Sequence, residues 1–230
     1  MKIVNYLAGA VFLGMMAAAP AQAAVVTGLT NTGVSVSGNV DNAWSITGGA
    51  SDPTISYPAP AYVNGPHPNW IPNSATSNWI TPYDPFNQST DPSVNGTYHF
   101  QTTFTVTGAS LGAFFTGQFA ADNVVSQILL NGQAIYTGPV SGSQFNGWTA
   151  FGANTFFLDG VNTLEFDVVN YAQRGGNSSG LNVQFLTAAC LSPHLGDDDS
   201  WLLWCWLCRI PPEIGSGIAD RLSAPIGIAQ

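Results

Sequence analysis

The sequence predicts an all-β protein, an antiparallel β-sandwich of jelly-roll type. Several segments alternate apolar and polar residues with a period of two, which is typical of half-buried strands. Turn-forming residues, among them 25 glycines and 15 prolines, separate these segments. No segment after residue 24 has the period of an amphipathic helix. These features indicate short strands joined by turns within one domain.

The predicted strands follow one another along the second half of the chain. The clearest is TYHFQTTFTVT, which places Tyr98 and Phe100 on one face. His99 and Gln101 lie on the opposite, polar face. A later segment contains Asn131-Gly132, a strong signal for a hairpin turn. The strands predicted in this way are 97–107, 112–121, 126–136, 162–170 and 180–187.

Residues 50–96 differ from the rest, because they contain most of the prolines. Proline lacks the backbone N–H that a central strand needs, so this segment is expected to be a long excursion over the sandwich. Its many aromatic residues favour an ordered path. The side chains expected to anchor it are Trp70, Trp79, Tyr83 and Phe86.

Composition and the N-terminus indicate an exported protein that does not bind nucleic acid. The 230 residues carry a net charge of -9 with only four lysines and arginines, whereas phosphate recognition needs a basic surface. Residues 1–23 contain Lys2, an apolar run and a small-x-small motif, which is the pattern of a signal peptide. Cleavage is expected between Ala23 and Ala24. The expected domain plan is a signal peptide at 1–23, a sandwich at 24–189 and a separate tail at 190–230.

Three stretches carry a resemblance to a known family. They are GQFAADNVVSQILLNGQAI, FNGWTAFGANTFFLDGVNTLEFDVVN and GLNVQF, with NWITP ahead of them at 78–82. They resemble the galactose-binding-like jelly roll of bacterial exported PEP-CTERM proteins and, more loosely, the sugar-binding sandwich domains of some glycoside hydrolases. The resemblance covers about residues 75–187. It implies a non-catalytic protein of the cell surface or extracellular matrix, associated with exopolysaccharide.

The tail at 190–230 departs from that family. PEP-CTERM proteins end in a Pro-Glu-Pro motif, an apolar helix and an arginine cluster that an exosortase reads during export. Here three aspartates, three tryptophans and two cysteines crowd together instead. Shifted by one base, the codons of 194–201 can encode Thr-Trp-Ala-Met-Met-Ile-Leu-Gly, which resembles the anchor of one PEP-CTERM subgroup. The tail is therefore predicted to be an out-of-frame, poorly ordered translation, and the exosortase to be a partner only if the frame is restored.

Carbohydrate binding would use exposed aromatic rings together with side-chain amides. Trp148 lies in the turn-rich stretch FNGWTAF, with Asn146 close by. The predicted sugar-binding set is Trp148, Asn146, Asn123 and Trp79, and the expected partner is an extracellular polysaccharide. The alternative for each tryptophan is packing in the core.

A structural calcium ion is the cofactor that the loops of such a domain could hold, because Ca²⁺ prefers carboxylate and carbonyl oxygens. The loop acids that could contribute are Asp52, Asp84, Asp91 and Asp122. The alternative is that each aspartate only shapes a turn before proline or asparagine.

Two motifs in the sequence have catalytic potential. Glu165 and Asp167 share a strand face and could serve a secreted glycan hydrolase, although solvated charges are the expectation there. His99 has no partner nearby in the sequence and is expected to be a surface residue. The stretch GASLG at 108–112 matches a hydrolase nucleophile motif but stands between two strands, which predicts a turn. The chain is therefore predicted not to be an enzyme, and a purely structural matrix protein remains the third alternative.

Overall fold

The computed structural model describes residues 25–49, 55–84, 95–108, 110, 112–172 and 178–190. Several sequence-based expectations concern residues outside these ranges. They are the cleavage site at Ala23 and Ala24, the loop acids Asp52 and Asp91, the anchor Phe86, and the tail from residue 191 onward. Within the described residues, no helix is long and apolar enough to cross a membrane.

All regular elements of the described residues are strands, and every pairing between them is antiparallel. The first six are β1 (Val25–Thr27), β2 (Val36–Ser37), β3 (Val40–Gly49), β4 (Ala59–Val63), β5 (Ile80–Thr81) and β6 (Gly96–Thr107). The others are β7 (Ala113–Asp122), β8 (Val124–Leu130), β9 (Gln133–Thr137), β10 (Gln144–Ala153), β11 (Gly160–Asn170) and β12 (Gly180–Cys190).

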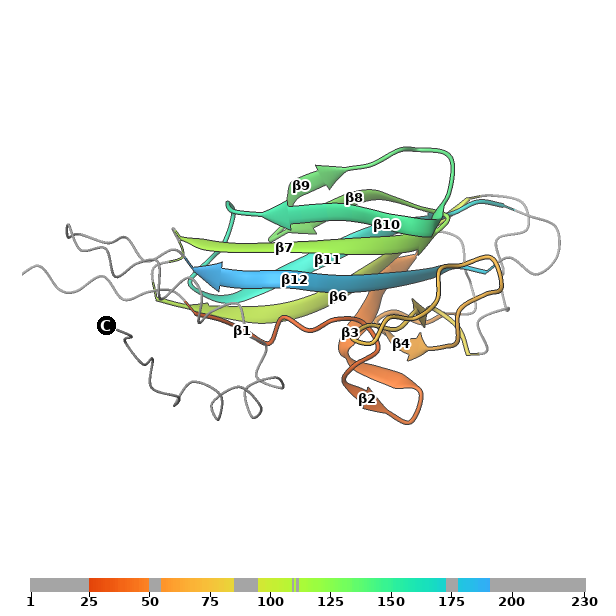
Figure 1. Ribbon diagram of the computed structural model, residues 1–230, viewed down its shortest axis with the longest axis horizontal. Helices are drawn as coiled ribbons and strands as arrows, with labels where there is room; N and C mark the ends of the chain where they lie inside the picture. Colours follow the sequence, from red (N-terminus) through yellow and green to blue (C-terminus); the bar gives the residue numbers. More distant parts are fainter. Residues whose placement is uncertain are drawn as a thin grey trace, which may run out of the picture.

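The strands form two facing layers. One contains β10, β7 and β12 side by side, and the other contains β3, β6, β11, β8 and β9 in that order (Figure 1). The short strands β4 and β5 link them, since β4 pairs with β3 and β5 pairs with β12. The predicted antiparallel β-sandwich of jelly-roll type is confirmed.

Aromatic side chains hold the two layers together. Phe119 of β7 and Phe151 of β10 meet Phe166 of β11, with ring centroids 5.8 Å and 5.2 Å apart. Both contacts are edge-to-face, the arrangement that the charge distribution of aromatic rings favours. Trp44 of β3 also meets Phe166, with ring centroids 5.8 Å apart. The centre of the core is therefore a cluster of rings contributed by both layers.

The proline-rich segment contains strands that the proline rule did not anticipate. Pro60 lies within β4, opposite Ser45 of β3. On its other edge, β4 pairs with β5 only at Tyr62 and Val63, beyond the proline. Because β5 does not extend to Pro60, the missing N–H costs no hydrogen bond to β5.

Residues 64–79 of this segment cover part of the outer face of β7. Trp70 and Trp79 are buried, with ring centroids 4.3 Å apart, and both pack against Ala120. Tyr83 packs instead in the core between the layers, where its hydroxyl hydrogen-bonds that of Tyr98 at 2.7 Å. The outer face of this layer is therefore covered at one end and open farther along the strands.

Candidate functional site

Trp148 and Asn146 lie at the solvent-exposed surface of β10. The indole of Trp148 is 36% exposed, and Asn146 is exposed as well. Phe151 points into the core, so the alternation along β10 directs Trp148 and Ala150 to the outer face. Two of the four predicted sugar-binding residues are thus exposed neighbours on one strand.

A row of amides continues across the same outer face. Gln118 of β7 lies opposite Ala150 of β10. Its Nε2 donates to Oε1 of Gln184 in β12 at 3.0 Å. Nε2 of Gln184 in turn donates to the hydroxyl of Thr76 at 2.8 Å. These linked side chains, Gln118, Gln184 and Thr76, form a pre-ordered amide row beside β10.

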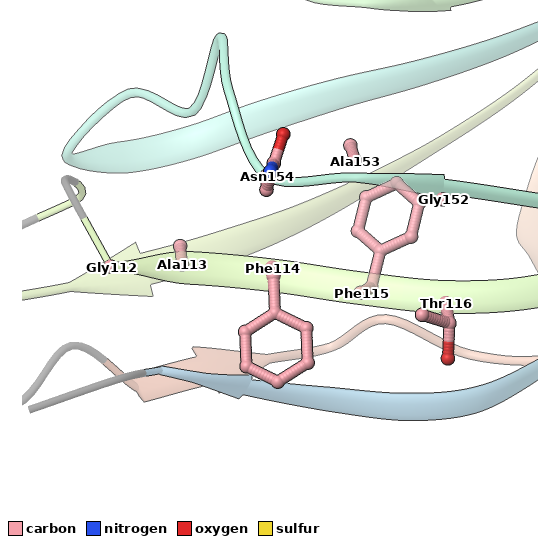
Figure 2. Close-up of a pocket in the computed structure, with 8 residues that line it drawn as sticks. All are labelled: Gly112, Ala113, Phe114, Phe115, Thr116, Gly152, Ala153 and Asn154. Atoms are coloured by element: carbon pink, nitrogen blue, oxygen red, sulfur yellow. The ribbon is translucent and has the colours of Figure 1, made fainter.

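A shallow hollow lies where the start of β7 meets the end of β10. The hollow has a volume of about 640 Å³ and is lined by 112–116 and 152–154. Figure 2 shows Phe114 and Phe115 leaving β7 in opposite directions, with Gly152 of β10 alongside. The seven residues from Trp148 to Asn154 span six steps, about 20 Å at the rise of a strand. The lining contains a hydroxyl and an amide but no titratable side chain.

This surface has the chemistry that an uncharged polyhydroxyl ligand requires. An exposed indole can cover the C–H face of a sugar ring, while amides donate to and accept from its hydroxyl groups. The amide row is fixed by its own hydrogen bonds, so less conformational entropy is lost when a ligand binds.

The other two predicted sugar-binding residues do not face solvent. Trp79 is 0% exposed, and its indole N–H donates to the carbonyl of Ile71 at 2.9 Å. Asn123 is also buried. Its Nδ2 donates to Asp122, and its Oδ1 accepts the N–H of Tyr171 at 2.7 Å. The prediction that these two side chains contact a sugar is therefore wrong, because both are committed to internal hydrogen bonds.

The described loop acids are not assembled into a calcium site. Asp84 is exposed and accepts a hydrogen bond from Asn39. Asp122 is buried, and its carboxylate accepts Trp70 Nε1 at 2.8 Å and Asn123 Nδ2 at 2.7 Å. Burial raises the pKa of Asp122 to about 6, although the hydrogen bond from Trp70 acts in the opposite direction. In the described part of the chain, the one cluster that could hold a metal ion includes neither residue.

That cluster consists of His99, Glu165 and Asp167 on the outer face of the other layer. The register of β6 and β11 places His99 directly opposite Asp167. His99 Nδ1 is 2.5 Å from Asp167 Oδ1 and 3.5 Å from Glu165 Oε1. His99 has no partner nearby in the sequence, and the fold supplies one in Asp167. The expectation of solvated charges is wrong for Asp167, which is only 3% exposed, whereas Glu165 is partly exposed. The signal that could have found the cluster was the pairing of two predicted strands.

Neighbouring side chains hold both carboxylates in place. Gln127 Nε2 donates to Asp167 Oδ2 at 2.5 Å. Gln101 Nε2 donates to Glu165 Oε2 at 3.0 Å, and the Thr47 hydroxyl donates to the same oxygen at 3.4 Å. The hydrogen bond with Asp167 raises the pKa of His99 despite partial burial of the ring. Burial would raise the pKa of Asp167, but hydrogen bonds from His99 and Gln127 outweigh it, and that pKa is lowered.

The stretch at 108–112 connects β6 to β7, so it joins two strands as expected. The N–H of Ser110 donates to Asp159 Oδ1 at 2.9 Å, and the Ser110 carbonyl accepts the N–H of Ala113 at 3.1 Å. These bonds are those of a turn, not of the strand-to-helix junction that a hydrolase nucleophile requires.

No protein family and no curated protein matches the chain. Among solved structures, the chain is similar to a family 35 carbohydrate-binding module from an environmental isolate. The TM-score is 0.31 at 10% sequence identity, and the match covers 68% of this chain and 98% of that chain. A similarity at this level does not establish a shared function.

Proposed function

We propose that this chain is an exported, non-catalytic β-sandwich protein that binds extracellular polysaccharide through the outer face of β10, β7 and β12. One observation carries the proposal: Trp148 is exposed two residues before Ala150, which lies opposite Gln118 of the amide row that Gln118 forms with Gln184 and Thr76. An aromatic platform next to fixed hydrogen-bonding groups suits the mixed apolar and hydroxyl surface of a sugar.

The ligand that fits best is a neutral polysaccharide. The chain carries a net charge of -9, which repels acidic polymers at long range. The amide row and the lining of the hollow contain no charged side chain that could pair with a sugar carboxylate or sulfate. The distance of about 20 Å from Trp148 to Asn154 favours a chain of sugars over a single ring.

The geometry favours binding over hydrolysis. A glycosidase needs two carboxyl groups that reach the scissile bond from a cleft. Asp167 is buried, and its two oxygens are occupied by His99 and Gln127. The Glu165 and Asp167 pair also lies on the layer opposite Trp148. The alternative of a glycan hydrolase therefore has the weaker support.

Export and surface association are supported by the sequence of residues 1–23 and by the resemblance to PEP-CTERM proteins. In this proposal the protein acts at the cell surface or in the exopolysaccharide matrix. An exosortase would process the chain only with the sorting anchor in its normal frame.

Replacing Trp148 with alanine is expected to weaken binding to a neutral polysaccharide about tenfold or more, because the apolar platform is lost. Trp148→Phe should retain most of the affinity, since a smaller ring still covers the sugar. Affinity gel electrophoresis against a panel of neutral and acidic exopolysaccharides measures the effect, with calorimetry for those that bind.

Val161→Ala is the matched control, because Val161 is an exposed apolar residue at the start of β11, in the other layer. It should leave binding unchanged. Equal affinity of Trp148→Ala and the unaltered protein would remove this face as the binding surface. If the unaltered protein bound none of the polysaccharides, the structural-matrix alternative would gain support instead. Release of saccharides that Glu165→Gln abolishes would establish the hydrolase.

A further inference from the structure

We propose that His99, Glu165 and Asp167 form a site for a divalent transition-metal ion, with Zn²⁺ the best chemical match. The ligand atoms of the three side chains all lie within 4.8 Å of one another. This site is on the layer opposite Trp148 and does not depend on the proposed sugar binding.

The donor set selects the type of ion. One imidazole nitrogen and two carboxylate oxygens suit Zn²⁺ and similar ions, whereas Ca²⁺ and Mg²⁺ prefer oxygen ligands only. A tetrahedral zinc site places its ligand atoms about 3.4 Å apart. The distance of 3.5 Å between His99 Nδ1 and Glu165 Oε1 already fits. The 2.5 Å hydrogen bond between His99 and Asp167 must open by about 1 Å, and the ring then carries its hydrogen on Nε2.

The surrounding side chains orient each carboxylate as in a metal centre. One oxygen of Asp167 faces His99, while Gln127 holds the other. One oxygen of Glu165 likewise faces His99, while Gln101 holds the other. Hydrogen bonds to the second oxygen of a ligating carboxylate fix its direction and tune the affinity for the ion. The two oxygens that face His99 are therefore the ones that would bind the ion, and Asp167 would exchange its hydrogen bond with His99 for the metal.

The charge balance also favours a cation. The described residues contain no lysine or arginine. Of their side chains, only a protonated His99 can offset the two adjacent negative charges, and it leaves the cluster with a net charge of -1. A divalent ion bound to neutral His99 balances both carboxylates, which removes the repulsion between them.

The site is open on its outer side. The side chain of His99 is 35% exposed and that of Glu165 is 20% exposed, so an ion can enter and water can complete its coordination. Gly48 of β3 lies opposite His99. A Cβ atom at position 48 would lie only 2.8 Å from Cδ2 of His99, so glycine is what leaves room for the ring.

Zinc titration of the full-length chain tests the proposal. To prevent competition for the ion, His194 is replaced by asparagine. Cys190, at the end of β12, and the tail residues Cys205 and Cys208 are replaced by serine. Calorimetry with Zn²⁺ should then give one site per chain. Glu165→Gln, which keeps the shape of the side chain, and His99→Asn should each weaken binding about 100-fold or more, because a direct ligand is lost. Ca²⁺ should not compete.

His67→Asn is the matched control, since it removes the other described histidine while leaving the cluster intact, and it should bind zinc like the starting protein. Thermal unfolding with and without Zn²⁺ gives a second readout, because an ion that binds only the folded state raises the melting temperature. Equal zinc affinity in Glu165→Gln, or equal competition by Ca²⁺, would overturn the proposal. Trp148→Ala should leave zinc binding unchanged, so failure of sugar binding and failure of metal binding are separate outcomes.

Discussion

Replacing Phe166 with alanine is expected to lower the free energy of unfolding by about 3–5 kcal/mol. The ring is fully buried and contacts Trp44, Phe119 and Phe151 from three other strands. Because those rings are fixed by both layers, they cannot close the cavity that the substitution creates. A loss of this size is a large fraction of the total stability of an ordinary domain.

Phe156→Ala provides the matched control for this substitution. Phe156 is 49% exposed and precedes β11, so removing its ring should change stability by less than about 0.5 kcal/mol. Urea unfolding followed by tryptophan fluorescence and circular dichroism measures both variants. A change below about 1 kcal/mol for Phe166→Ala would mean that the two layers are not held together by this ring cluster.

The strands predicted from alternation are those with one face in the core and one polar face. The expected strand at 97–107 corresponds to β6 at Gly96–Thr107, and the expected strand at 162–170 corresponds to β11 at Gly160–Asn170. In both, burial alternates nearly residue by residue. The period of two in the sequence therefore reflects the alternation of side chains between the core and the solvent-facing side of the sheet.

Strands whose outer face is not polar do not show this alternation of apolar and polar residues. β10 carries Trp148, Ala150 and Gly152 on its outer side, so apolar and polar residues do not alternate along it. The pairing of β10 with β7 is also irregular between Gln144 and Thr149, which interrupts the period. The same features matter for function, because the unusual outer face of β10 is the proposed sugar platform.

The site residues depended on information that no single segment contains. His99 and Asp167 become partners only through the register of two strands that are far apart in the sequence. Trp79 was expected both as an anchor of the proline-rich segment and as a sugar-binding residue, and Asn123 as a sugar-binding residue; the structure buries both. Trp79 is buried because residues 64–79 cover one end of β7. Asn123 is buried where its backbone N–H donates to the carbonyl of Val169 in β11. Exposure of an aromatic or amide side chain in a loop-rich chain cannot be read from its local sequence.

The stability that Asp122 contributes is expected to fall as the pH rises from 4 to 8. Its pKa is raised from 3.8 in the unfolded chain to about 6 in the folded one, mainly by burial. Between these values the folded state binds a proton that the unfolded state does not. The stabilisation from this proton is fully present below about pH 3.8 and is lost as the pH rises through about 6. The difference of about two pKa units corresponds to about 3 kcal/mol.

Asp122→Asn isolates this effect, because the amide cannot ionise. Its Oδ1 can still accept the indole N–H of Trp70, but its Nδ2 would face Nδ2 of Asn123, at a cost of about 1 kcal/mol that does not vary with pH. The raised pKa of His99 also lowers stability as the pH rises. The quantity to measure is therefore the difference in the free energy of unfolding between the unaltered protein and Asp122→Asn at each pH. Urea unfolding at pH 4, 6 and 8 should show the advantage of the unaltered protein over Asp122→Asn falling steadily and then reversing. A difference that stays constant or grows with pH would mean that the carboxylate of Asp122 is ionised in the folded state without penalty, and that the hydrogen bonds from Trp70 and Asn123 fully offset its burial.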